Sequence, residues 1–324
     1  MRYIFLLTVF LIWSNSSFSD DKLIKVDFDK SMGVENYPQY KLMMRHQDGK
    51  KILDFYRDLF NKNFYSSQNN QSQIPKIIHQ IWIGPRPVPE IYKKYAEGCK
   101  KLHPDWEYKL WTQEELNAEN FPTKYMKLFE DMQYRYSGKK DIIEFFLLYK
   151  YGGVVMDMDF ECIKPFDSIT ENHDFFASLE PGVYWSDIPV MTNAIIGSIP
   201  DNVLFLETLD KAIRMHDADY TKYNTGIRFF IRKMKSVFTH ERGIKVSDSR
   251  RIFLLNFAEN FRKNNSFYTN PIIFPATYFN PVFPFQNKKY SVVDKIKVWL
   301  GLENGDNYFI KVRPETIAIQ DFYD

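Results

Sequence analysis

The sequence predicts an α/β fold in which helices flank a mixed, mostly parallel central sheet. From residue 74 onward, short apolar runs of strand length alternate with segments of helical periodicity, as expected for strands joined by crossover helices. One helix is apolar on most of its sides and ends in two glycines directly before a strand. The chain of 324 residues, 44% of them hydrophobic, can build a core without a disulfide or metal. Its net charge of +2 speaks against nucleic acid as the main partner.

Residues 1–19 predict a signal peptide or a short signal anchor. Arg2 precedes the apolar run Tyr3–Trp13, and Ser17 and Ser19 stand in a small-x-small arrangement. The run is shorter than the roughly 20 residues that a membrane span needs, so a cleaved signal peptide is favoured over an anchor. We therefore expect the protein in the secretory pathway, in the ER or Golgi lumen or secreted, with membrane association through this segment as the alternative.

Residues 20–73 predict a helical stem and linker, with a helix around Tyr40–Asn61 and a polar stretch after it. Residues 74–324 predict one large domain. Cys99 and Cys162 can pair in an oxidising compartment, but two separate buried thiols are the slightly favoured interpretation.

The ordered part opens with alternating strands and helices. A β-branched apolar run predicts a buried strand over Ile77–Ile83, with His79 as a buried structural histidine. Helical spacing follows over Pro89–Lys101, and apolar–polar alternation predicts a second strand over Trp106–Leu110. Thr112–Glu115 is a capping-box pattern that predicts the start of the next helix.

A buried helix and a short strand lead to two acids. The helix is predicted by apolar residues at i, i+3, i+4 and i+7, namely Ile142, Phe145, Phe146 and Tyr149. Gly152 and Gly153 end the helix, and Val154–Met156 form a strand that leads directly into Asp157 and Asp159. Because ligands of open α/β sheets bind at the carboxyl ends of strands, these acids lie where a site is expected.

The rest of the chain is less regular. We predict strands at Phe175–Leu179 and Ala194–Ile196, and helices at Val203–Met215 and Thr225–Val237. The Phe- and Pro-rich stretch Pro271–Pro284 predicts a loop with short edge pieces.

Asp157 and Asp159 form a D-x-D pattern that predicts a metal site. Residues i and i+2 of a strand face the same side, and two adjacent carboxylates repel each other unless a cation lies between them. A hard divalent cation, Mn²⁺ or Mg²⁺, satisfies both and can also bind phosphate oxygens. That arrangement suits a nucleotide-sugar donor, from which a diphosphate must leave. The alternative is a solvated acidic turn after a strand.

Three motifs, in order, resemble glycosyltransferase family 32. The run Asp141–Phe160 resembles the D-x-D sugar-binding region of that family, Ile74–Gly84 its opening strand, and Trp106–Trp111 its second strand. The family includes Golgi and sphingolipid mannosyltransferases, with the glucosylating toxins as distant relatives. The resemblance implies a GT-A-like nucleotide-sugar-binding fold for residues 74–324 as the catalytic domain. It also implies a divalent metal, a GDP-mannose or UDP-hexose donor, a glycan, protein or lipid acceptor, and retention at the anomeric carbon.

The resemblance assigns roles to single residues. Asp157 and Asp159 match the D-x-D acids, one near the ribose or sugar of the donor and one on the metal. Asp141 matches an acid that opens the buried helix and contacts the donor, a position that also suits a helix cap. Trp82 matches an aromatic residue beside the nucleotide base, with core packing as the alternative.

Two departures from the family pattern concern charge and metal ligands. Glu144 stands where the family usually carries Arg, so Lys139 or Lys140 would have to supply positive charge to the donor, and we assign Lys140 to that role. The usual C-terminal His is absent, and Gln320, Asp321 or Asp324 would complete the metal shell, with Asp321 as our choice.

Two other classes of function compete with the transferase. A catalytically inactive nucleotide-sugar- or carbohydrate-binding protein on the same fold is the main alternative. A glycoside hydrolase is the last, because its two acids stand roughly 5–10 Å apart on opposite sides of the bond, whereas adjacent i and i+2 acids point the same way.

Overall fold

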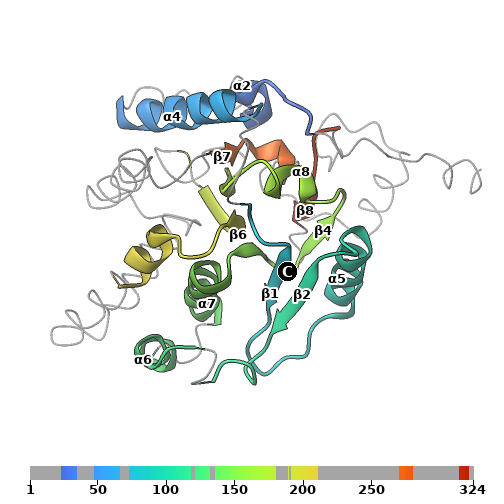
Figure 1. The fold of residues 1–324 in the computed structure, drawn as a ribbon, viewed down its shortest axis with the longest axis vertical. Coiled ribbons are helices and arrows are strands. Elements are labelled where there is room, and N and C mark those ends of the chain that lie inside the picture. Colours follow the sequence, from blue (N-terminus) through green and yellow to red (C-terminus); the bar gives the residue numbers. More distant parts are fainter. Residues whose placement is uncertain are drawn as a thin grey trace, which may run out of the picture.

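The computed structural model describes residues 23–34, 47–65, 73–117, 121–131, 136–179, 189, 191–210, 270–279 and 314–320. Within these ranges, the centre is a six-stranded sheet in the order β2-β1-β3-β6-β5-β7 (Figure 1). Its strands are β1 (Ile77–Ile81), β2 (Glu107–Trp111), β3 (Gly153–Met156), β5 (Phe175–Leu179), β6 (Met191–Ser198) and β7 (Pro271–Phe274). A second, two-stranded sheet joins β4 (Phe160–Cys162) to β8 (Ala318–Gln320).

The central sheet is mixed, with parallel pairs in the majority. The pairs β1–β2, β1–β3 and β5–β7 are parallel, whereas β6 runs antiparallel to β3 and β5. Every residue of β3, β5 and β6 is buried, as expected for strands covered on both faces. The predicted α/β class is confirmed.

Helices flank the central sheet (Figure 1). They are α5 (Glu90–Leu102), α6 (Thr123–Asp131), α7 (Tyr136–Tyr151) and the single turn α8 (Asp167–Thr170). Helix α7 packs against β1, β3 and β6, and in Figure 1 it lies across the β1–β2 pair from α5. Residues 142–148 are all buried, so the prediction of a helix apolar on most sides is confirmed.

Two glycines make the turn from α7 into β3, as predicted. Gly152 and Gly153 have φ angles of 64° and 87°, which L-residues with a side chain rarely adopt. The Gly152 N–H donates to the carbonyl of Leu148 at 3.1 Å and closes the helix. A Cβ on Gly153 would lie 2.7 Å from the carbonyl oxygen of Ile77, so this close approach between β3 and β1 requires glycine.

The N-terminal helices α2 (Phe28–Met32) and α4 (Gln47–Asn63) lie together beside β7 at one end of the molecule (Figure 1). Helix α4 buries Ile52, Leu53 and Phe60 in the common core. The side-chain amide of Asn63 donates to the carbonyl of Pro271 at 2.6 Å, which satisfies an acceptor of the edge strand β7.

The helix predicted around Tyr40–Asn61 is therefore present from residue 47, and residues 35–46 lie outside the described ranges. This helix shares the core with residues 271–279. The boundary at residue 73 and the assignment of residues 1–19 stay predictions. Among the described residues, no helix combines the length and apolar character that crossing a bilayer requires.

Some predicted elements differ from the structure. The Thr112 N–H donates to the Glu115 carboxylate at 2.9 Å, as in a capping box, but only a turn follows and the predicted helix is wrong. The first turn of a helix is unfavourable by itself, because it fixes the backbone of several residues and gains few hydrogen bonds. Here the chain leaves the turn with Leu116 buried. The predicted strand Ala194–Ile196 is longer, because it is the centre of β6.

In the stretch Pro271–Pro284, the predicted edge piece is β7, the last strand of the sheet, followed by the short helix η1 (Ala276–Tyr278). Residues 203–210 are helical, as predicted. Residues 211–215, the predicted helix Thr225–Val237 and residues 280–284 lie outside the described ranges.

Candidate active site

The two acids of the D-x-D pattern lie in a turn between β3 and β4. Asp157 directly follows β3, Met158 and Asp159 form the turn, and β4 begins at Phe160. The prediction that both acids face one side of a strand is therefore wrong, because the strand ends at Met156. The Asp157 N–H still donates to the carbonyl of Ala194 in β6 at 2.8 Å. Because β1, β2 and β3 are parallel, the turn shares the carboxyl edge of the sheet with the residues that follow β1 and β2.

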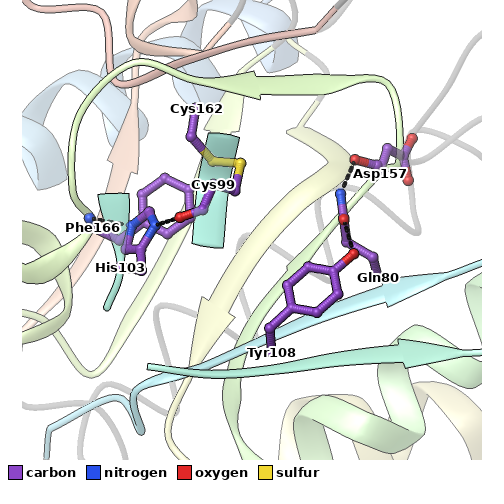
Figure 2. Close-up of a disulfide and its surroundings, with 7 residues drawn as sticks. All are labelled: Gln80, Cys99, His103, Tyr108, Asp157, Cys162 and Phe166. Atoms are coloured by element: carbon purple, nitrogen blue, oxygen red, sulfur yellow. Dashed lines mark hydrogen bonds between the residues drawn. A yellow bond between two sulfur atoms is a disulfide. The ribbon is translucent and has the colours of Figure 1, made fainter. Parts of the chain in front are cut away.

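Uncharged groups hold the main chain at the start of this turn (Figure 2). The Gln80 amide donates to the carbonyl of Asp157 at 3.0 Å, and the Tyr108 hydroxyl donates to the Gln80 amide oxygen at 2.5 Å. Gln80 is fully buried. Figure 2 shows the Asp157 carboxylate pointing away from Gln80, which leaves that carboxylate for other partners.

The chain after the turn is held by a disulfide and a histidine (Figure 2). Cys99 of α5 is bonded to Cys162 of β4, so the expectation of two separate thiols is wrong. The ring of His103 lies 2.7 Å from the carbonyl of Cys99 through Nδ1, and the Phe166 N–H donates to its Nε2 at 2.9 Å. A carbonyl only accepts and an amide N–H only donates, so this ring is neutral with its proton on Nδ1. We call Gln80, Tyr108, His103 and the Cys99–Cys162 disulfide the neutral side of the turn.

Charged groups from α7 meet the carboxylate of Asp157. Lys140 Nζ lies 2.6 Å from Glu144 Oε1 and also donates to Asp157 Oδ1. The amide of Asn193, in β6, donates to Asp141 Oδ1 at 2.9 Å and to Glu144 Oε2 at 3.0 Å. We call Lys140, Asp141, Glu144 and Asn193 the charged side of the turn.

Asp141 lies inside α7, which begins at Tyr136, so the prediction that it opens the helix is wrong. Of the two lysines considered, Lys140 reaches Asp157, whereas Lys139 Nζ lies over the ring of Phe129 at 4.2 Å. Neither Gln80 nor Asn193 was predicted as a site residue. Each of them reaches the site through strand pairing.

Burial and crowding shift the charges of this cluster. Burial, with the nearby charges of Asp157 and Asp141, raises the pKa of Glu144 above its ordinary value, and the charge of Lys140 opposes this shift. Burial by itself lowers the pKa of Lys140, but the charges of Asp157, Glu144 and Asp141 outweigh it and hold that pKa well above its ordinary value. Lys140 is therefore a permanent cation at neutral pH, placed among three acids.

Asp159 is crowded by its neighbour in the turn. Burial first, and then the charge of Asp157, raises the pKa of Asp159 to about 7. Its one side-chain donor in the described residues is the amide of Gln320, in β8, at 3.3 Å from Oδ2. The two carboxylates thus repel each other when both are ionised, and a nearby positive charge would reduce this repulsion.

These oxygens fit a hard divalent cation. Carboxylates and an amide are the donor types that Mn²⁺ and Mg²⁺ prefer, and Mg²⁺ often takes only one or two carboxylates beside substrate phosphates and water. The described residues contain no group of three or more His, Cys, Asp or Glu side chains that could hold a metal ion. Asp321, predicted as a third ligand, lies outside the described ranges, as does Asp324.

Trp82 lies just past the end of β1, at the same carboxyl edge of the sheet. Its indole N–H donates to the carbonyl of Arg86 at 2.7 Å, and its ring contacts Tyr92 edge-on at 6.0 Å. The side chain is half-buried, and its only polar group is already hydrogen-bonded. A ligand would therefore contact Trp82 through the surface of its ring.

His79 is buried, as predicted. Its Nε2 lies 3.0 Å from the carbonyl of Gly152, and Trp111 donates to its Nδ1 at 3.1 Å. Burial lowers the pKa of His79 to about 4, so this ring is neutral and structural.

The class to which this fold and site point is that of the D-x-D glycosyltransferases. Residues 89–176 match the family model "Glycosyltransferase sugar-binding region containing DXD motif". The matched stretch includes Lys140, Asp141, Asp157 and Asp159. The resemblance predicted from the motifs is confirmed for this part of the chain.

Two relatives in sequence are yeast proteins. The chain is 30% identical over 167 residues to inositol phosphoceramide mannosyltransferase 1 of Schizosaccharomyces pombe, covering 49% of either chain. It is 34% identical over 148 residues to mannosyl phosphorylinositol ceramide synthase SUR1 of Saccharomyces cerevisiae, covering 44% of this chain and 36% of the relative. The chain thus spans half or less of the length of these relatives. Among solved structures, the PaToxG glycosyltransferase is similar with a TM-score of 0.40 and 19% identity, over 69% of this chain and 87% of the other.

Proposed function

We propose that this protein is a glycosyltransferase that moves a hexose from a nucleotide-sugar donor to an acceptor, with a divalent cation at Asp157 and Asp159. The observation that carries the proposal is the position of these two carboxylates in one turn at the carboxyl edge of the sheet, in a stretch that matches a D-x-D family model. A hydrolase is less well supported, because it needs two acids on opposite sides of the scissile bond.

The names of the relatives favour a particular reaction. They favour mannose from GDP-mannose over a UDP-hexose, and a lipid of the inositol phosphoceramide type over a glycan or protein acceptor. Retention at the anomeric carbon is part of the proposal and follows from the family resemblance.

Each residue of the site has a proposed task. A bound Mn²⁺ or Mg²⁺ supplies positive charge for the leaving diphosphate, and Asp157, Asp159 and Asp321 would hold it. Lys140 adds a permanent cation at the same edge, where it can bind phosphate oxygens. Asp141, oriented by Asn193, accepts hydrogen bonds from donor hydroxyls. The ring of Trp82 provides a surface for the base.

We propose that the protein resides in the secretory pathway, associated with a membrane through residues 1–19 where these are not cleaved. The Cys99–Cys162 disulfide supports an oxidising compartment, because cytosolic thiols are kept reduced.

The proposal is tested by replacing each acid with its amide. Asp157→Asn and Asp159→Asn should each lower Mn²⁺-dependent transfer from GDP-mannose by about 10²–10³, because the leaving group loses its counter-charge. Donor hydrolysis and transfer to inositol phosphoceramide are measured together, with UDP-hexoses as competing donors.

Melting without metal is the matched control. Asp159→Asn should melt at the wild-type temperature or above it, because it removes a crowded charge. Asp157→Asn should not gain stability, because it loses the contact with Lys140. If both variants melt at the wild-type temperature and still turn over donor at the wild-type rate, the metal does not bind at Asp157 and Asp159. Wild-type protein that binds donor without turnover would favour the binding-protein alternative.

A further inference from the structure

Lys140 occupies the place where a cation would meet Asp157. Its ammonium contacts Asp157 Oδ1, one of the oxygens that the proposed metal site needs. A divalent cation and a lysine ammonium compete for a carboxylate when both cannot contact it at once. The apparent affinity for the cation is then reduced to the extent that Asp157 is already paired.

Glu144 gives the same ammonium a second partner. Its Oε1 lies 2.6 Å from Lys140 Nζ, so the lysine can release Asp157 and keep its hydrogen bond to this carboxyl group. Glu144 is only 2% exposed, and Asn193 holds its other oxygen at 3.0 Å. The carboxylate is therefore fixed in position, and the flexible partner of the three is the lysine side chain.

We propose that Lys140 is an internal counter-ion that a divalent cation displaces from Asp157, and that Glu144 retains the ammonium when it is displaced. This inference rests on the cation site proposed above. Lys140 and Glu144 act through Asp157 and are positioning residues for the metal. In the absence of metal, the lysine keeps the Asp157 carboxylate neutralised. On metal binding, the ammonium stays at the site through Glu144, beside the incoming phosphates.

The chain offers a matched control for charge alone. Lys139 is the adjacent residue and carries the same charge, but its ammonium lies over the Phe129 ring. Lys139→Met and Lys140→Met remove the same formal charge from the same helix, and only the second removes a contact with Asp157.

The experiment measures the dissociation constant of Mn²⁺ alone, by calorimetry and by the electron paramagnetic resonance signal of free Mn²⁺. Lys140→Met should bind Mn²⁺ at least about tenfold more tightly than wild type, because Asp157 no longer has a competing cation. Lys139→Met should stay within about twofold of wild type, because its charge is not in contact with the site. Glu144→Gln should bind about tenfold more weakly, because the ammonium has only Asp157 left as a partner.

The double variant Lys140→Met/Glu144→Gln separates displacement from a simple change in net charge. It removes the buried Glu144 carboxylate that Lys140→Met alone would leave without its cation, so it also covers the case in which Lys140→Met alone fails to fold. Displacement predicts that the double variant binds Mn²⁺ as tightly as Lys140→Met, because Glu144 acts only through the lysine. An effect of net charge predicts a return to the wild-type affinity, because one positive and one negative charge are removed.

Two results overturn the inference while the cation site stands. Wild-type binding that Asp157→Asn abolishes, combined with Lys140→Met no tighter than Lys139→Met, shows that the lysine does not compete. A double variant with wild-type affinity shows the same. If wild type, Lys140→Met and the double variant all fail to bind Mn²⁺, the cation site itself is wrong and the inference is wrong with it.

Discussion

The neutral and charged sides of the Asp157–Asp159 turn contact different parts of the chain. The neutral side contacts main-chain atoms or is covalent, through Gln80, His103 and the Cys99–Cys162 disulfide. The charged side meets the Asp157 carboxylate, through Lys140. A divalent cation does not compete for these uncharged hydrogen bonds or for the disulfide, whereas it can replace the lysine that pairs with a carboxylate. The difference lets charges rearrange at the site while the backbone of the turn stays in place.

The largest expected loss of stability comes from the disulfide. Replacing Cys99 and Cys162 together by Ala should lower the free energy of unfolding by about 2–5 kcal/mol, because the bond closes a loop of sequence separation 63. Urea unfolding measures the change. A reductant should lower the stability of the wild type in the same way and leave the double variant unaffected. If reduced and oxidised wild type unfold at the same urea concentration, the disulfide does not stabilise this part of the chain.

A smaller and pH-dependent effect is expected at His103. Burial lowers the pKa of this imidazole below its ordinary value of 6.5. A group whose folded pKa is depressed by desolvation of its charged form binds more protons when unfolded, so stability falls as the pH drops. The contribution of neutral His103 is therefore complete above pH 6.5 and is lost as the pH falls through its folded pKa.

His103→Gln should accordingly cost about 1–3 kcal/mol at pH 7.5, because the Phe166 N–H or the Cys99 carbonyl loses a buried partner. The stability gap between wild type and variant should narrow from pH 7.5 to 4.5, as followed by urea unfolding at each pH. A gap that is constant or widens on acidification would contradict a neutral, doubly bonded ring.

The smallest change in stability is expected for Tyr108→Phe, a variant that also allows the two sides of the turn to be compared directly. Tyr108→Phe removes one hydroxyl from Gln80 and should cost about 0.5–1.5 kcal/mol of stability. Its affinity for Mn²⁺ should equal that of wild type, whereas Glu144→Gln on the charged side should weaken binding. Calorimetry with Mn²⁺ on both variants makes the comparison, and a large loss of affinity in Tyr108→Phe would show that the neutral side also tunes the metal.

Local features of the sequence were predicted well. The helical periodicity of residues 142–149, the glycine pair after it and the acids after a short strand depend on neighbours in the chain. The capping box at Thr112 shows the limit of such reasoning, because its hydrogen bonds form and its helix does not. Leu116 is buried directly after this turn, and a single turn has few hydrogen bonds to stabilise a helix.

The partners of the acids were not predictable in the same way. Gln80 is 77 positions from Asp157, Asn193 is 52 from Asp141 and Gln320 is 161 from Asp159. These contacts exist because β1 pairs with β3, β6 inserts antiparallel beside β3, and β8 pairs with β4. No short-range pattern encodes those pairings.

The two adjacent lysines, Lys139 and Lys140, show what the sequence determines by itself and what only the tertiary structure determines. The sequence places positive charge just upstream of Glu144, and it places two acids after the strand that follows. Which lysine reaches those acids depends on how α7 is rotated against β3 and β6, and that rotation is held in part by the hydrogen bonds from Asn193 to Asp141 and Glu144. In that rotation Lys140 contacts Asp157 and Lys139 lies over the ring of Phe129, because adjacent residues of a helix point about 100° apart around its axis.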